Sequence, residues 1–225
     1  MAEARAEEKA AHAPRGVRVL LALLLLSGTV LFGIGAALHP HLTGSSEAQL
    51  AMISGTQHWR GIHLALVSGS VLVMCGGWSY FLRERPFAAP GVVVMALVLF
   101  TVGHAINALN TIYMTGAGAT IAELNAAGTP GMAALYSATH PFGLVAARAG
   151  NFIVAISALL LGWVGTRPGE PRWLGMLAWI SGVAGLVAVL SLREDNPLIL
   201  LPVALLCLWQ VGVVLLVLRE PHGNY

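Results

Sequence analysis

Six apolar runs, each about 20 residues long, decide what this chain can fold into. A run of that length crosses the hydrocarbon core of a bilayer as an α-helix. Lipid offers no hydrogen-bond partners to the backbone, so these runs must be helices, and the alternating pattern of barrel strands is absent. We predict an all-α integral membrane protein with six transmembrane helices, at Val17–Leu38, Trp59–Leu82, Gly91–Tyr113, Pro141–Gly165, Trp173–Leu192 and Leu198–Leu218.

Positive charge is concentrated at one set of helix ends. Only 10% of the residues are charged, against roughly 25% in a soluble domain. The positive-inside rule places Lys and Arg on the cytoplasmic side, so both termini are predicted to be cytoplasmic, and we expect the inner (plasma) membrane of a bacterium. The residues that carry this prediction are Arg5, Lys9, Arg15, Arg18, Arg83, Arg85, Arg167, Arg172 and Arg219, whereas the outer loops hold only Arg193, which Glu194 and Asp195 follow.

The chain is predicted to have one domain between two tails. Residues 1–16 form a cytoplasmic N-terminal tail, residues 17–218 the six-helix domain, and residues 219–225 a cytoplasmic C-terminal tail. The first apolar run is too long for a signal peptide. Cys75 and Cys207 lie inside spans and are interpreted as core residues. No basic face for nucleic acid is present, so the expected partners are the lipid bilayer and subunits of a membrane complex.

Two outer loops carry helix-start signals. The segment that begins at Ser46 and the segment that begins at Thr120 both fit a capping box, and they stop at Gly55 and Gly128. Each loop is predicted to hold a short helix that lies over the bundle. Together with the spans that follow, they suggest a repeated two-helix hairpin.

Six of the eight histidines are expected at the outer end of the bundle, where an intramembrane histidine marks a functional site by default. Helical spacing aligns His63 with Arg60, His104 with Asn107, and Asn151 with Arg148. These polar stripes should face one another. The predicted site is a funnel with His39, His41, His58 and His140 at the rim, His63 and His104 below, and Arg148, Asn107, Asn110 and Asn151 at the floor.

Arg148 is expected near the bilayer midplane, where a charge is costly. The spans contain no Asp or Glu, so the nearest carboxylates are Glu47 and Glu123 in the outer loops. Arg148 would therefore meet a bound anion, one of these glutamates, or only backbone carbonyls and water.

Neutral imidazole ligates haem iron, zinc and copper, which gives the leading hypothesis of a redox or metal-handling role. Haem b would use His63 and His104, with Arg60 or Arg148 on a propionate, Asn107 and Asn151 nearby, and Gly61, Gly69 and Gly103 giving the macrocycle room. A zinc or copper ion would instead use His58, His63, His104 and His140. No H-E-x-x-H or Cys/His motif supports either set, which rests on co-location alone.

Two other functions remain open, and no catalytic residue is assigned. A small transporter or receptor would bind an anionic or polar solute, or a quinone headgroup, through Arg148 and the asparagines. An accessory subunit would turn its polar stripes toward a partner's helices. The histidines could also be structural, since polar groups bridge membrane helices.

Overall fold

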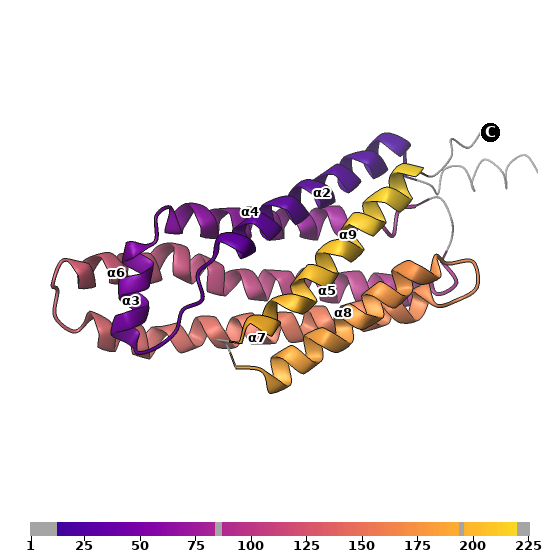
Figure 1. Ribbon diagram of the computed structural model, residues 1–225. Helices are drawn as coiled ribbons and strands as arrows, with labels where there is room; N and C mark the ends of the chain where they lie inside the picture. Colours follow the sequence, from indigo (N-terminus) through magenta and orange to yellow (C-terminus); the bar gives the residue numbers. More distant parts are fainter. Residues whose placement is uncertain (1–12, 84–86, 194–195, 220–225) are drawn as a thin grey trace, which may run out of the picture.

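The computed structural model describes residues 13–83, 87–193 and 196–219, and all the regular structure in these ranges is helical. Six helices are long and apolar enough to cross a membrane, which confirms the predicted fold class. The predicted tails lie largely outside the described residues, and the orientation in the membrane stays a prediction. The six helices are α2 (Arg15–Leu38), α4 (Trp59–Gly77), α5 (Pro90–Tyr113), α7 (Met132–Gly165), α8 (Arg172–Ser191) and α9 (Leu201–Arg219), as drawn in Figure 1.

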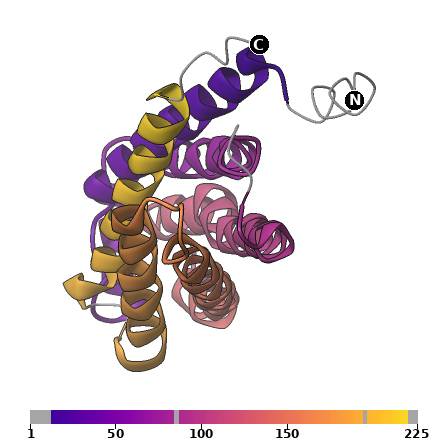
Figure 2. The same cartoon turned by 90° about the vertical axis from the view of Figure 1, so that its right-hand side faces the viewer.

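The six helices pack as a closed ring. Each helix contacts the next in the order α2, α4, α5, α7, α8, α9, and α9 contacts α2 to close the ring. Viewed along the bundle in Figure 2, α2, α9 and α8 form one row beside α4, α5 and α7. Leu25, Val73, Phe100 and Trp209 fill the centre between the rows with one shared apolar core.

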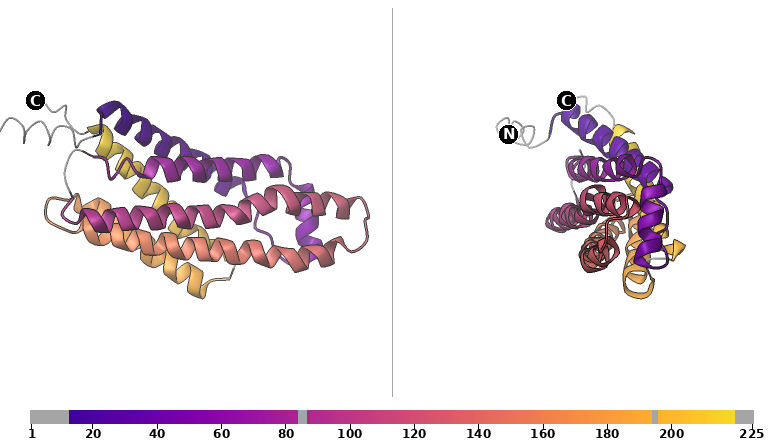
Figure 3. Two further views of the ribbon diagram at one scale, coloured as in Figure 1. Left: turned by 180° about the vertical axis from the view of Figure 1, so that it is seen from behind. Right: turned by 90° about the vertical axis from the view of Figure 1, so that its left-hand side faces the viewer.

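The third span is much longer than predicted. At its end α5 passes into a π-helix, η1 (Met114–Gly118), and then into α6 (Ala119–Ala126), so that one helical stretch of 37 residues results. At 1.5 Å per residue this is about 55 Å, against about 30 Å of hydrocarbon. The hairpin formed with α7 therefore projects beyond the other helices (Figures 1 and 3). We call this end of the bundle the outer end.

The predicted short helix in the second outer loop is present as α6, but Thr120 does not cap it. The path of α6 continues that of α5, and the Thr120 hydroxyl accepts a hydrogen bond from Arg60. Pro141 does not begin the fourth span but lies inside the 34-residue α7, which starts at Met132 after Gly131. Gly131 has a positive φ of 81°, and this left-handed turn residue ends the loop from α6.

The predicted short helix after the first span is confirmed as α3 (Ser46–Gly55), capped by Ser45, whose hydroxyl oxygen accepts from the Ala48 N–H at 3.4 Å. It crosses α6 and α7, as the right-hand view of Figure 3 shows. Leu50 and Ile53 of α3 pack with Trp59, Met114 and Tyr136 in a second apolar cluster. We call α3, α6 and the first turns of α7 the outer cap. A 3₁₀ turn, η2 (Pro197–Leu200), leads into α9.

Candidate functional site

The closest pair of site histidines is His39 and His63. His39 terminates α2, and His63 lies on the second turn of α4, buried with 1% of its surface exposed. Their Nε2 atoms are 3.2 Å apart, and their ring centroids 4.9 Å. Because α2 ends where α4 begins, the chain brings together two histidines that are 24 positions apart at the outer end of the ring.

Hydrogen bonds orient both rings of this pair. The Nδ1 atom of His63 is 2.9 Å from the Trp59 carbonyl oxygen, which can only accept, so Nδ1 carries the proton and Nε2 is a bare lone pair. Burial and, second, the charge of His63 lower the pKa of His39 to about 4, while a hydrogen bond to the Pro40 backbone acts the other way. The His39 ring is thus neutral near pH 7. The lone pair on the His63 Nε2 faces the His39 Nε2, and it needs a proton or a cation between the two rings.

Trp59 holds the pair in place, and sequence reasoning missed it. Its ring centroid lies 4.2 Å from that of His63 and 5.3 Å from that of His39. Its Nε1–H donates to the Met114 carbonyl of the π-helix at 3.0 Å. A π-helical turn, common at functional sites, interrupts the regular i→i+4 bonding of α5. The signal available in the sequence was spacing, because Trp59 and His63 are four residues apart and share a helix face.

Arg60 does not point toward the histidine pair. It forms an ion pair with Glu123 of α6 at 2.9 Å, and its Nε donates to the Thr115 carbonyl at 3.3 Å. Arg60 therefore ties α4 to the outer cap. Glu123 is engaged by Arg60 and is not the partner of Arg148 that the sequence left open.

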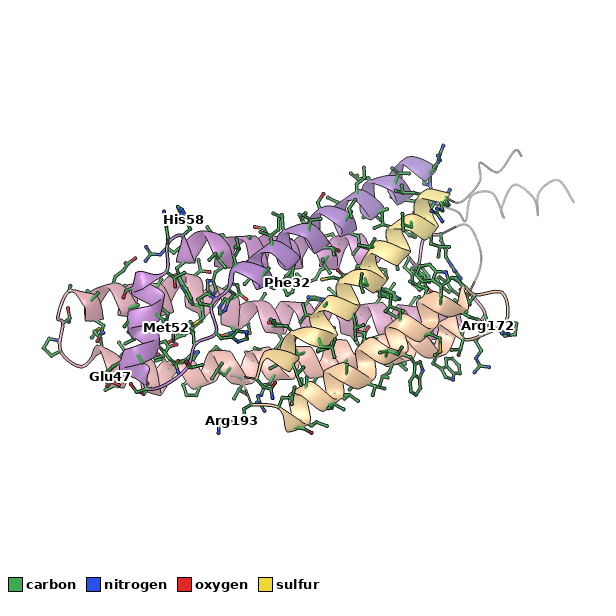
Figure 4. All side chains as sticks on the ribbon, in the orientation of Figure 1. Phe32, Glu47, Met52, His58, Arg172 and Arg193 are labelled. Carbon is green, nitrogen blue, oxygen red and sulfur yellow. The ribbon has the colours of Figure 1, made fainter. Side chains whose placement is uncertain are left out.

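His104 occupies a different place, between α5 and α2. Its ring is 5% exposed and packs edge-on against Phe100 at 4.5 Å and Phe32 at 6.3 Å. Phe32 is labelled in Figure 4. Among the described residues neither ring nitrogen of His104 has a hydrogen-bond partner. A buried imidazole without a partner is costly, so His104 is the histidine whose environment most demands an explanation.

The remaining histidines are separate from this pair. His140 stacks on Tyr136 at 4.5 Å and on Tyr113 at 6.3 Å, between α7 and α5. His58 is exposed and points away from the bundle in Figure 4, and His41 is exposed as well. In the part of the chain that the structure describes, no three His, Cys, Asp or Glu side chains gather into a possible metal site. The predicted four-histidine metal set is therefore not assembled.

Arg148 of α7 contacts the C-terminal end of α8. Its Nη1 donates to the Val189 carbonyl at 3.2 Å and its Nη2 to the Leu192 carbonyl at 2.8 Å, at the C-terminal end of α8. These contacts place Arg148 beside the outer end of α8, and its depth in the bilayer stays a prediction. There its charge complements the negative end of the α8 dipole.

We expect Arg148→Leu to lower the free energy of unfolding by about 1–3 kcal/mol, because two carbonyls at a helix end lose their donor. The stability of Arg148→Lys should lie between those of the parent protein and Arg148→Leu, since an ammonium keeps the charge but loses the planar fork. Urea unfolding in detergent measures both. A leucine variant as stable as the parent protein would show that these two bonds add nothing.

The predicted funnel floor is also divided. The Asn107 Nδ2 donates to the Asn151 Oδ1 at 2.6 Å between α5 and α7, and Asn151 also lines a cavity with residues of α8 and α9. Asn110 packs against Gly143, which has no side chain to displace it. The polar stripes therefore form three groups: the His39–His63 pair, the buried His104, and the Asn107–Asn151 bridge.

Comparison with known proteins gives no relative from which a role could be transferred: no family model, no curated protein and no solved structure matches the chain.

Proposed function

We propose that the His39–His63 pair binds a first-row transition-metal ion, copper(II) or zinc, in an open site at the outer end of this polytopic membrane protein. The distance of 3.2 Å between the two Nε2 atoms supports this proposal. Two imidazole nitrogens on a tetrahedral zinc ion, each about 2.0–2.1 Å from the metal, lie about 3.3 Å apart. The pair is thus spaced as two ligands of one ion are spaced.

The surroundings of the pair fit the same role. A ligating histidine usually donates its other ring N–H to a carbonyl, which fixes the ring and the tautomer, and the Nδ1 of His63 faces the Trp59 carbonyl in this way. With two protein ligands, two or more positions on the ion stay open to water or to a second ligand. Such a site suits capture and handover of the ion, or redox chemistry supplied by bound copper, rather than structural storage.

The parent protein, stripped with chelator in detergent, should bind about one Cu²⁺ or Zn²⁺ per chain, with copper tighter, as the Irving–Williams order requires. His39→Ala and His63→Ala should each weaken binding by more than about 100-fold, because loss of an outer-shell partner alone costs about 10–100-fold. Competition titration against a chelating indicator measures the affinity. Quenching of Trp59 fluorescence by copper reports the location, with Trp59→Phe as its reference.

The matched controls are His58→Ala and His140→Ala, which remove histidines of the predicted four-histidine set that lie away from the pair. Both should keep parental affinity. Binding that survives in the His39→Ala/His63→Ala double variant, or a parent protein that binds neither ion, would contradict the proposal.

Haem b is a second candidate, and one observation favours it: both ring nitrogens of His104 lack a partner among the described residues. The packing around His104 does not fit the macrocycle. A Cβ at Gly69 would lie 2.6 Å from the Phe32 nitrogen, and one at Gly103 would lie 2.8 Å from the Gly150 carbonyl oxygen. Neighbouring helices therefore occupy the space beside these glycines, and no room is left for a macrocycle. A Soret band lost in His104→Ala, but not in His39→Ala, would establish haem instead of the metal pair.

The other functions have less support. A solute site at Arg148 would compete with the two carbonyls that this side chain already serves. An accessory-subunit role stays a prediction.

A further inference from the structure

A small half-enclosed cavity lies between α7, α8 and α9, away from the histidines. Its volume is about 50 Å³, enough for about three to five water-sized groups. It exists because small side chains of α7 and α8 leave space that α9 does not fill. The residues that line it include Ala155, Ala158, Gly185, Ala188, Val203 and Leu206.

Two polar side chains also line this cavity, and only one has a spare donor. The Ser181 hydroxyl donates to the Pro202 carbonyl at 3.2 Å. The Asn151 Oδ1 accepts from the Asn107 Nδ2, but the Asn151 amide nitrogen donates to no group among the described residues. Among the described residues that line the cavity, the Asn151 amide N–H₂ group is thus the side-chain donor without a partner.

The position of this amide gives the cavity a direction. Asn151 lies one helical turn from Arg148, at the outer end of α8, whereas Ala158 lies about 10 Å further along α7 toward the other end. The cavity is therefore polar at the outer end and apolar along its length. Water is a poor occupant, because a buried water needs two to four polar partners.

We propose that this cavity binds a short stretch of a membrane amphiphile's hydrocarbon chain, about three to five methylene groups, next to a carbonyl oxygen that accepts a hydrogen bond from the Asn151 amide. A chain entering from the outer interface would place its carbonyl at Asn151 and its apolar part between Ala155 and Leu206. Both the ester of a phospholipid and the head of an isoprenoid quinone have this chemistry. The site is independent of the metal proposal, since it shares no residue with the His39–His63 pair.

The test is photo-crosslinking of the full chain in vesicles of phosphatidylethanolamine and phosphatidylglycerol that contain a trace of phosphatidylglycerol with a diazirine in one acyl chain. Peptide mass spectrometry should find the label concentrated on lining residues such as Val203 and Leu206. Excess decylubiquinone distinguishes the two sources: displacement of the label identifies a quinone site, and an unchanged label identifies a phospholipid site.

Two variants and one control make the result specific. Asn151→Val should lower the labelling by about fivefold, as the loss of one neutral hydrogen bond predicts. Val203→Phe, which fills the cavity, should lower it further. Asn107→Val loses the same interhelical hydrogen bond but does not line the cavity, so it should label like the parent. The proposal would be overturned if Val203 and Leu206 were labelled no more than the exposed Phe142 and Val145, and if the label on them were equal in all variants.

Discussion

Replacing Arg83 by methionine should lower the free energy of unfolding by about 3–5 kcal/mol, because it leaves the Glu170 carboxylate buried without a counter-charge. The Nη2 of Arg83 reaches both carboxylate oxygens of Glu170, at 2.5 and 2.6 Å. Both side chains are only 3% exposed, and the guanidinium lies 3.8 Å from the ring centre of Phe87. The pair joins the segment after α4 to the connection between α7 and α8.

The double variant Arg83→Met/Glu170→Leu should recover most of that loss, since replacing a whole buried ion pair by apolar groups is often neutral or stabilising. Arg167→Met is the matched control: this arginine also covers an aromatic ring, Trp163 at 3.9 Å, but it is exposed. It should change stability by about 0.5–1 kcal/mol. Chemical unfolding in detergent compares the four proteins, and an Arg83→Met protein no less stable than Arg167→Met would refute the expectation.

This ion pair also shows where sequence reasoning stops. The sequence presents Arg83 as one of nine Lys and Arg residues at the cytoplasmic helix ends, and Glu170 as a loop residue 87 positions away. The positive-inside rule uses only the side of the membrane on which a charge lies. It contains nothing about which helix ends are neighbours, and that follows from the order of helices round the ring.

The spans themselves could be predicted because hydrophobic length is a local property. The continuity of the helices through Thr120 and Pro141 could not. Thr120 and Pro141 both look like helix starts, yet packing of α3 across α6 and α7 stabilises continuous helices through both positions. Tertiary packing outweighs a capping signal that contributes only about 1 kcal/mol.

Helical phase predicted the candidate site in part. It assigned Asn107 and Asn151 to polar stripes that should face one another, and these two side chains do share a hydrogen bond. It could not predict that His39, interpreted as a rim residue, is the partner of His63. Phase relates residues within one helix, whereas His39 lies just beyond the end of α2 and reaches His63 through the crossing of α2 and α4. The contact of Arg148 with the end of α8 could not be predicted either, because it depends on which helices are neighbours in the ring.

The last expectation concerns the contact between α5 and α7. Gly150→Ala should lower the free energy of unfolding by about 3 kcal/mol, the upper part of the usual overpacking range. Its Cβ would lie 2.5 Å from the Gly103 carbonyl oxygen and 2.6 Å from the Asn107 nitrogen. These are backbone atoms of a neighbouring helix, so the clash is relieved only if the helices separate. Small residues allow this close approach where no hydrophobic effect drives membrane helices together.

Gly103→Ala should have a similar effect from the other helix, because its Cβ would lie 2.8 Å from the Gly150 carbonyl oxygen. The Gly103→Ala/Gly150→Ala double variant should cost less than the sum, since helices already separated by one methyl group accept the second more easily. Gly33→Ala is the control: no atom lies within 4 Å of its Cβ position, so helix propensity alone should make it neutral or stabilising by up to about 1 kcal/mol. If Gly150→Ala and Gly33→Ala were equally stable, the close approach of α5 and α7 at Gly103 and Gly150 would be contradicted.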